Sequence, residues 1–184
     1  MEKNSVIIGL ILLVVGLGVG YTLSGNKNSV AGNHMMPNGA MMGQNIDQHF
    51  IVQMIPHHEG AIAMAKIALE RSKRPEMLSL ANGIIEAQEK EITDMRGWYQ
   101  SWYGSTPPAG GMGMHMGGMT GNPDTLNAVS DAEFDREFIV EMIPHHEMAV
   151  MMASMLQATT ERPEMRQLAD NIITSQSREI DVMR

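Results

Sequence analysis

Length, composition and charge already narrow what this protein can be. A chain of 184 residues fits one domain with an N-terminal appendage, and a formal charge of −8 argues against a nucleic-acid partner, which would require a basic face. The sequence has no cysteine, which excludes thiolate metal sites and disulfides, but it has 20 methionines against 11 leucines. Methionine adds a polarizable sulfur to apolar volume, so this excess indicates that the thioether itself has a use.

The N-terminus carries an uncharged, mostly apolar run over residues 6–23, preceded by Lys3. A run of this length can span a membrane as a helix and is also compatible with a cleaved export signal. We therefore predict a membrane anchor or signal segment over residues 1–25, followed by a Met/Gly-rich linker over residues 26–46. The protein is then expected outside the cytoplasm, anchored to the cytoplasmic membrane or secreted to the periplasm or cell exterior.

An internal duplication sets the architecture. Residues 47–96 align with residues 135–184 without a gap, and 26 of these 50 pairs are identical. Apolar residues recur at spacings of three and four through two helices in each copy. One helical hairpin cannot bury its apolar stripe alone, so we predict an all-α, ferritin-like four-helix bundle made of two duplicated hairpins. The hairpins are expected over residues 47–103 and 131–184, joined by a Gly/Met/His-rich crossover linker over residues 104–130.

Two local signals refine the predicted helices. Pro56 and Pro144 fall inside the first helix of each copy. An interior proline costs about 3 kcal/mol, yet the apolar phase resumes beyond each one, which predicts a kink and not a break. Ser130 and Glu133 predict a capping box ahead of the first helix in the second copy.

The sequence Met-Ile-Pro-His-His-Glu occurs at residues 54–59 and again at 142–147. Adjacent helical residues point about 100° apart, so one histidine of each pair could be a core residue and the other a solvated one. A bundle with pseudo-twofold symmetry could instead bring the two copies together. Burying several imidazoles without partners would cost about 1–3 kcal/mol each, and a shared metal ion would remove that cost. This favours His57, His58, His145 and His146 as metal ligands, with the Met54 thioether on the same helix face.

A methionine stripe follows the second histidine pair, at helical spacings of three and four: Met148, Met151, Met152 and Met155. Such a stripe usually fills a core. The first copy serves as a control, because its equivalent positions hold a single sulfur, that of Met64. The additional thioethers, Met148 and Met152 among them, are consistent with added metal capacity.

Further methionines and histidines lie in segments too rich in glycine to form a core. The segment after the apolar run has His34, Met35 and Met36, and the crossover linker has Met112, Met114, His115, Met116 and Met119. A plain flexible linker would be built from serine and glycine, and exposed methionine is liable to oxidation. Closely spaced thioethers on a flexible backbone can wrap a soft ion and select Cu(I) over Zn(II), Mg(II) or Ca(II).

Common metalloenzyme motifs are missing from the sequence. No glutamate is followed three residues later by a histidine, as di-iron bundles require, and there is no His-Glu-x-x-His zinc motif. We therefore predict a binding protein and not an enzyme. Two alternatives stay open: a ferritin-like metal-dependent oxidoreductase, and a structural or interaction bundle whose methionines form an adaptable surface.

The repeated motif Phe-Ile-Val-x-Met-Ile-Pro-His-His-Glu, with Arg-Pro-Glu at 74–76 and 162–164, resembles the bacterial domain-of-unknown-function family 305. These are secreted or anchored ferritin-like proteins with a His-His motif in each repeat, and they include a copper-binding, copper-tolerance protein. The resemblance implies Cu(I) binding, with Ag(I) as a second candidate, in copper sequestration, carriage or tolerance. The implied ligands are Met54, His57, His58, Met142, His145 and His146. The expected partners are metal ions, the membrane through the N-terminal helix, and a copper-export protein or a second copy. Because neutral imidazole is the ligand, affinity is expected to weaken as pH falls through about 6.5.

Overall fold

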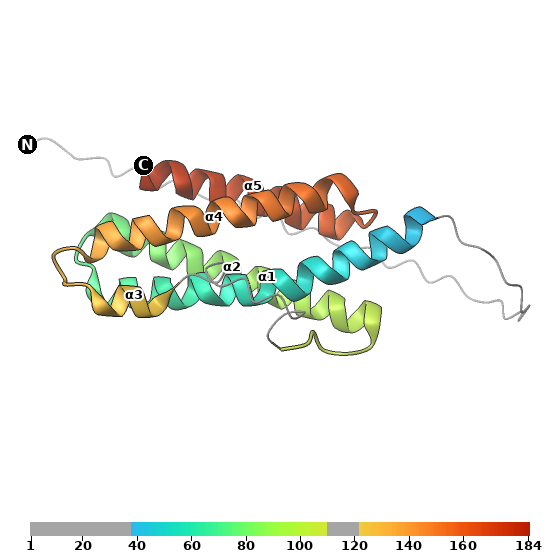
Figure 1. Cartoon of the computed structure of the whole chain (residues 1–184), viewed down its shortest axis with the longest axis horizontal. Coiled ribbons are helices and arrows are strands. Elements are labelled where there is room, and N and C mark those ends of the chain that lie inside the picture. The colour runs from blue at the N-terminus through green and yellow to red at the C-terminus, as the bar shows by residue number, and fades with distance from the viewer. Residues whose placement is uncertain (1–37, 110–121) are drawn as a thin grey trace, which may run out of the picture. The chain divides into compact units, whose positions relative to one another are not determined.

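The computed structural model describes residues 38–109 and 122–184, and both ranges are helical with no strand. Its helices are α1 (Asn38–Arg71), α2 (Pro75–Tyr103), α3 (Pro123–Ala128), α4 (Phe134–Thr159) and α5 (Pro163–Met183). The four long helices form a bundle (Figure 1), which confirms the predicted all-α fold. The predicted anchor at residues 1–25 lies outside the described residues. Within the described ranges, no helix combines the length and apolarity needed to cross a membrane.

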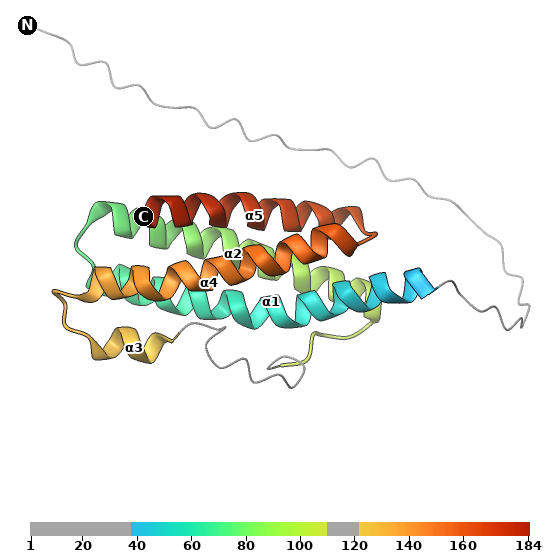
Figure 2. The same cartoon turned by 45° about the horizontal axis from the view of Figure 1, so that its top comes forward.

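The bundle consists of two hairpins that meet through their first helices. α1 packs on α2, α4 packs on α5, and α1 packs on α4. In both views α1 and α4 run in opposite directions, whereas α2 and α4 run in the same direction (Figures 1 and 2). The chain must therefore return along the length of the bundle between α2 and α4. This is the crossover connection that the long segment after α2 predicted.

Helix boundaries follow local chemistry and correct three details of the prediction. α1 begins at Asn38, inside the segment 26–46 predicted as a linker, because methionine, alanine and glutamine readily extend a helix. The predicted linker 104–130 also contains α3, capped by the Asn122 side chain, which accepts from the Asp124 amide. Ser130 Oγ donates to the Glu133 carboxylate at 3.1 Å, so the predicted capping box does not form.

The interior prolines do not interrupt their helices. α1 runs through Pro56 and α4 runs through Pro144. Each helix continues because the residues on both sides of the proline bury apolar side chains against neighbouring helices. The free energy gained by burying these apolar side chains outweighs the loss of one backbone hydrogen bond.

The core is divided into two apolar clusters, one at each end of the bundle. The first draws on the N-terminal half of α1 and includes Met54, Ile92 and Ile172. The second draws on the C-terminal half of α1 and includes Met64, Ile84 and Ile180. Polar residues from all four long helices lie between these clusters. We call this belt the polar layer; its members are the buried residues His57, His58, Gln88, Glu91, His145, His146 and Gln176 and the partly buried Glu179.

Two ion pairs at equivalent positions of the two copies join the hairpins, and one pair is more deeply buried than the other. Asp47 is 1% exposed and pairs with Arg162 at 3.3 Å, and the Arg162 guanidinium lies 3.9 Å from the centroid of the Trp102 ring. Burial raises the pKa of the Asp47 carboxyl. The equivalent pair, Arg74 and Asp135, has the same geometry at 3.2 Å, but the Arg74 side chain is 75% exposed. The two copies share this pair but not its environment.

Candidate metal centre

All four paired histidines are buried, with exposed fractions of 3% or less. The two members of each pair point in different directions, as adjacent helical residues must, but both directions lead into the bundle. His57 meets His145 of α4, and His58 meets Glu91 of α2. The alternative in which one histidine of each pair is solvated is therefore excluded. Because α1 and α4 each lie between two other helices, both histidines find a neighbour.

Two histidines are held by carboxylates, one buried and the other partly buried. His58 Nε2 lies 2.7 Å from Glu91 Oε2, and His146 Nε2 lies 2.6 Å from Glu179 Oε2. A carboxylate accepts, so each Nε2 carries a hydrogen, and in the neutral form of either ring the lone pair then lies on Nδ1. Both Nδ1 atoms are buried and have no hydrogen-bond partner. A ring that donates through one nitrogen to a carboxylate and keeps the other nitrogen free has the arrangement typical of metal-ligating histidine.

The other two histidines meet at the centre of the polar layer. The rings of His57 and His145 have centroids 3.7 Å apart and planes tilted by 38°. His145 Nε2 donates to the backbone oxygen of His57 at 3.1 Å, which leaves the lone pair of His145 on Nδ1. Neither ring nitrogen of His57 has a partner. The two copies are thus equivalent in sequence but not in hydrogen bonding.

The central pair is held in the neutral form. Burial, with smaller contributions from the neighbouring histidines, lowers the pKa of His57 to about 2. Burial likewise lowers the pKa of His145 to about 3, with His146 and His58 as additional causes. Neutral imidazole is the ligand form, so both rings keep their lone pairs well below neutral pH. This revises the expected pH dependence, because these two rings do not titrate near 6.5.

Two buried glutamines complete the polar layer. Gln88 and Gln176 are each 2% exposed, and neither amide group has a hydrogen-bond partner. Each precedes by three residues the glutamate that holds a histidine, so amide and carboxylate share a helix face. Such groups cost free energy when buried unpaired, and buried groups of this kind usually satisfy a bound water or ion.

The donor set fits a soft ion better than a hard one. In the described ranges, no three histidine, aspartate or glutamate side chains converge so as to hold a metal ion. A zinc or di-iron centre needs such a group. A soft monovalent ion can be held by fewer ligands, including thioethers, which that criterion does not count. The free Nδ1 atoms and the fully buried thioethers of Met54 and Met142 supply donors of this kind.

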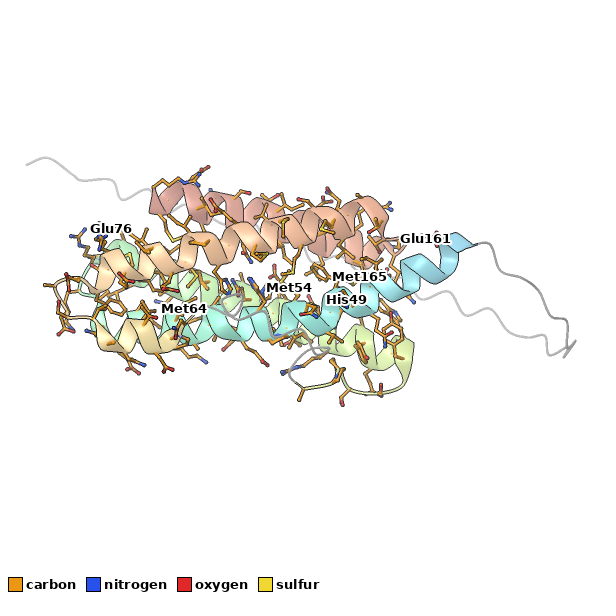
Figure 3. All side chains as sticks on the ribbon, in the orientation of Figure 1. His49, Met54, Met64, Glu76, Glu161 and Met165 are labelled. Carbon is orange, nitrogen blue, oxygen red and sulfur yellow. The ribbon has the colours of Figure 1, made fainter. Side chains whose placement is uncertain are left out.

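The structure separates the predicted methionines into three groups. Met54, Met64 and Met142 are 0% exposed; Met54 belongs to one core cluster, and the other two belong to the second. Figure 3 shows Met54 and Met64 along α1. Met148 and Met152 of α4 are partly buried. The predicted loop ligands lie outside the described residues: His34, Met35, Met36, Met112, Met114, His115, Met116 and Met119.

Sequence reasoning missed the two glutamates that hold the histidines. Glu91 and Glu179 fall within the predicted hairpins, but neither was among the predicted site residues. The available signal was a glutamate retained in both copies on an apolar helix face, next to Ile92 and Ile180. Only the packing of the second helix against the first shows that each carboxylate reaches a histidine.

The glutamate inside the histidine motif is not part of the centre. Glu59 follows His58 directly, but its side chain is 51% exposed and pairs with Arg96 at 2.6 Å. Glu91, by contrast, is 8% exposed and lines a groove of about 510 Å³ between α2 and α5, together with Asp94, Trp98 and Glu164. This groove, which Lys90 also lines, brings solvent close to one carboxylate of the polar layer.

These features define a four-helix protein built from two hairpins around a buried histidine layer. The family model described as "Domain of unknown function (DUF305)" matches residues 47–184. The chain therefore belongs to the DUF305 family, which confirms the resemblance seen in the sequence.

Several known proteins are similar to this chain. CopM in its Cu(II)-bound form is 52% identical, with a TM-score of 0.69 over 74% of this chain and 92% of that chain. CopM in its Cu(I)-bound form is 50% identical, with a TM-score of 0.66 over 74% and 91%. A DUF305 fragment from Deinococcus radiodurans is 29% identical, with a TM-score of 0.67 over 75% and 92%. An uncharacterised protein of Acanthamoeba polyphaga mimivirus is 43% identical over 49 residues, which span 27% of this chain and only 32% of that relative.

Proposed function

We propose that this protein binds a soft monovalent metal ion, Cu(I) first and Ag(I) second, in the polar layer of the bundle. The observation that carries the proposal is a set of buried imidazole Nδ1 atoms without partners, on rings whose Nε2 atoms are engaged. His58 and His146 donate to carboxylates, and His145 donates to a backbone oxygen. A bound cation would satisfy these nitrogens and remove the cost of burying them.

Chemistry and similarity both support copper as the cargo. Neutral imidazole and thioether are the ligands that Cu(I) prefers, and the chain has no thiolate that would favour other sites. CopM, about half identical to this chain, is known in Cu(I)-, Cu(II)- and silver-bound forms. The role that follows is sequestration, carriage or tolerance of copper, with the ion as cargo and no reaction catalysed. We further propose that residues 1–25 anchor or export the protein, so that it acts outside the cytoplasm.

The test uses ¹⁵N NMR of the histidine side chains during titration of the full chain with Ag(I), which is stable in air. We expect the Nδ1 resonances of His58 and His146 to shift by tens of ppm, while their Nε2 atoms keep their hydrogens. That shift on one nitrogen only reports coordination at the atom that the carboxylates leave free.

The readout separates the polar layer from the methionine-rich segments outside the described residues, which have their own histidines. If stoichiometric Ag(I) and anaerobic Cu(I) both leave the four paired histidines unchanged, the polar layer is not the site. Coordination through Nε2, with loss of the carboxylate hydrogen bonds, would likewise overturn the geometry proposed here.

A further inference from the structure

The outer face of α4 carries a row of methionines, of which Met152 packs against a core cluster while the two most exposed members do not belong to the core. Met151 is 49% exposed and Met155 is 59% exposed, while Met148 and Met152 are partly buried beside them. We call these four residues the α4 methionine stripe. An apolar side chain left in water gains nothing from burial, and methionine loses more side-chain entropy than leucine when ordered. Packing therefore does not explain why sulfur occupies these exposed positions.

The first hairpin shows what the same scaffold does without the stripe. The equivalent residues of α1 are Gly60, Ala63, Met64 and Ile67. Their single thioether, that of Met64, is 0% exposed and belongs to the core. Since more than half of the aligned residues are identical in the two copies, the stripe is a difference in side chains and not in backbone. Among the side chains whose burial the structure describes, the exposed methionines lie on α4.

The spacing of the stripe suits a soft ion. Met151 and Met155 are four residues apart, as are Met148 and Met152, and such pairs have Cβ atoms about 5–6 Å apart on one helix face. Flexible thioether side chains at that separation can turn two sulfurs toward one ion. Between residues 137 and 159 the helix has no lysine or arginine that would repel a cation.

The α4 methionine stripe also extends toward the polar layer. Met148 follows His145 by three residues, so the partly buried end of the stripe lies one helical turn from a buried imidazole of the polar layer. Exposure is greatest at Met155 and Met151, intermediate at Met152 and Met148, and only 3% at His145. A weak outer site followed by a stronger inner site is the order needed to load a buried centre.

We propose that the α4 methionine stripe is a surface capture site for soft monovalent cations, and that it passes them to His145. The passage rests on the proposed function of the polar layer, whereas capture at the surface does not. Met151 and Met155 form the outer pair that first takes the ion. Met148 and Met152 form the inner pair that lies next to the histidine.

The test labels the methionine methyl groups with ¹³C and titrates the full chain with Ag(I). We expect the Met151 and Met155 methyl signals to shift. The double variant Met151→Leu/Met155→Leu should bind about one Ag(I) equivalent fewer than the wild type. The control Val140→Leu, at another exposed apolar position on α4, should bind as the wild type does. The double variant should also load the paired histidines at least several-fold more slowly, with unchanged final affinity.

Three results would overturn the proposal in distinguishable ways. If the Met151 and Met155 signals stay fixed while the histidine signals shift, capture by the stripe is wrong and the polar-layer function stands. If the methionine signals shift and the histidine signals do not, the stripe binds but transfers nothing, and the polar-layer function is wrong. If the double variant loads the histidines as fast as the Val140→Leu control, the stripe is not the route.

Discussion

Replacing Glu91 by glutamine tests whether the buried carboxylates support the histidine ligands. The amide oxygen of glutamine can still accept from His58 Nε2, so the 2.7 Å contact persists but loses its charge. A bound cation makes the imidazole N–H more acidic, and a carboxylate stabilises that state better than an amide does. Hydrogen bonds to charged groups contribute about 1.5–3 kcal/mol and neutral ones about 0.5–1.5 kcal/mol. The difference, about 1–1.5 kcal/mol, corresponds to roughly tenfold in affinity.

We therefore expect Glu91→Gln to weaken the tightest Cu(I) site about tenfold, within the range known for residues that orient metal ligands. Glu179→Gln should do the same through His146, and the double variant should lose about a hundredfold if the effects are independent. The assay is an anaerobic competition titration against a chromophoric Cu(I) chelator. Circular dichroism and urea unfolding confirm that each variant keeps its fold.

The matched control is Glu59→Gln, because Glu59 is adjacent to His58 in sequence but pairs with Arg96 in solvent. Its affinity for Cu(I) should stay within about twofold of the wild type, since exposed ion pairs contribute little. Equal losses in Glu59→Gln and Glu91→Gln would mean that overall charge, and not the buried contact, controls binding. No loss in Glu91→Gln would refute the reasoning outright.

Three further results are expected. Because His57 and His145 have pKa values of about 2 and 3 in the folded state and about 6.5 unfolded, the unfolded chain binds more protons below pH 6.5. The free energy of unfolding of the metal-free protein should therefore be highest above pH 6.5 and should fall toward pH 3 by at most about 3 kcal/mol per pH unit. A free energy of unfolding in urea that stays constant from pH 7 to 4 would contradict this. Gln88→Leu should leave the free energy of unfolding unchanged or raise it by about 1–3 kcal/mol, because an unpartnered buried amide is removed. If urea unfolding shows a decrease of that size instead, the amide has a partner. Arg162→Ala should lower the free energy of unfolding by about 3 kcal/mol, because it removes the ion-pair partner of a buried carboxylate. Arg74→Ala should lower it by less than about 1 kcal/mol, because that arginine is exposed. Equal decreases in stability on thermal unfolding would refute the distinction.

Much of the fold could be predicted from the sequence because the duplication and the helical periodicity both constrain it. Two hairpins with apolar stripes have few ways to bury them, and the long segment after α2 allowed the crossover. The exact boundaries were harder. The start of α1 at Asn38 depends on extending a helix through residues with no apolar pattern, and α3 depends on a cap at Asn122 within a glycine-rich segment.

The candidate site was predictable only in part. The repeated His-His pairs identified four residues that the bundle does bring together, although their role as metal ligands stays a prediction. The carboxylate partners were not predictable, because Glu91 and Glu179 lie 33 residues beyond the histidines they contact. The motif itself pointed to Glu59, which faces solvent. Glu59 is next to His58 in sequence, whereas Glu91 contacts His58 across helices. Only the packing of the helices determines the second contact.

Fusion of the two hairpins into one chain has a consequence for how they can diverge. Two separate identical hairpins would associate under strict symmetry, and every substitution would occur twice. Joined by the crossover, each hairpin changes alone: His145 donates to the opposite backbone whereas His57 does not, and the exposed methionines among the side chains that the structure describes lie on α4. One half can thus specialise in receiving an ion while the other keeps an imidazole with both nitrogens free. A protein built from a duplicated hairpin can therefore have two chemically different sides, whereas the two halves of a symmetric homodimer must be identical.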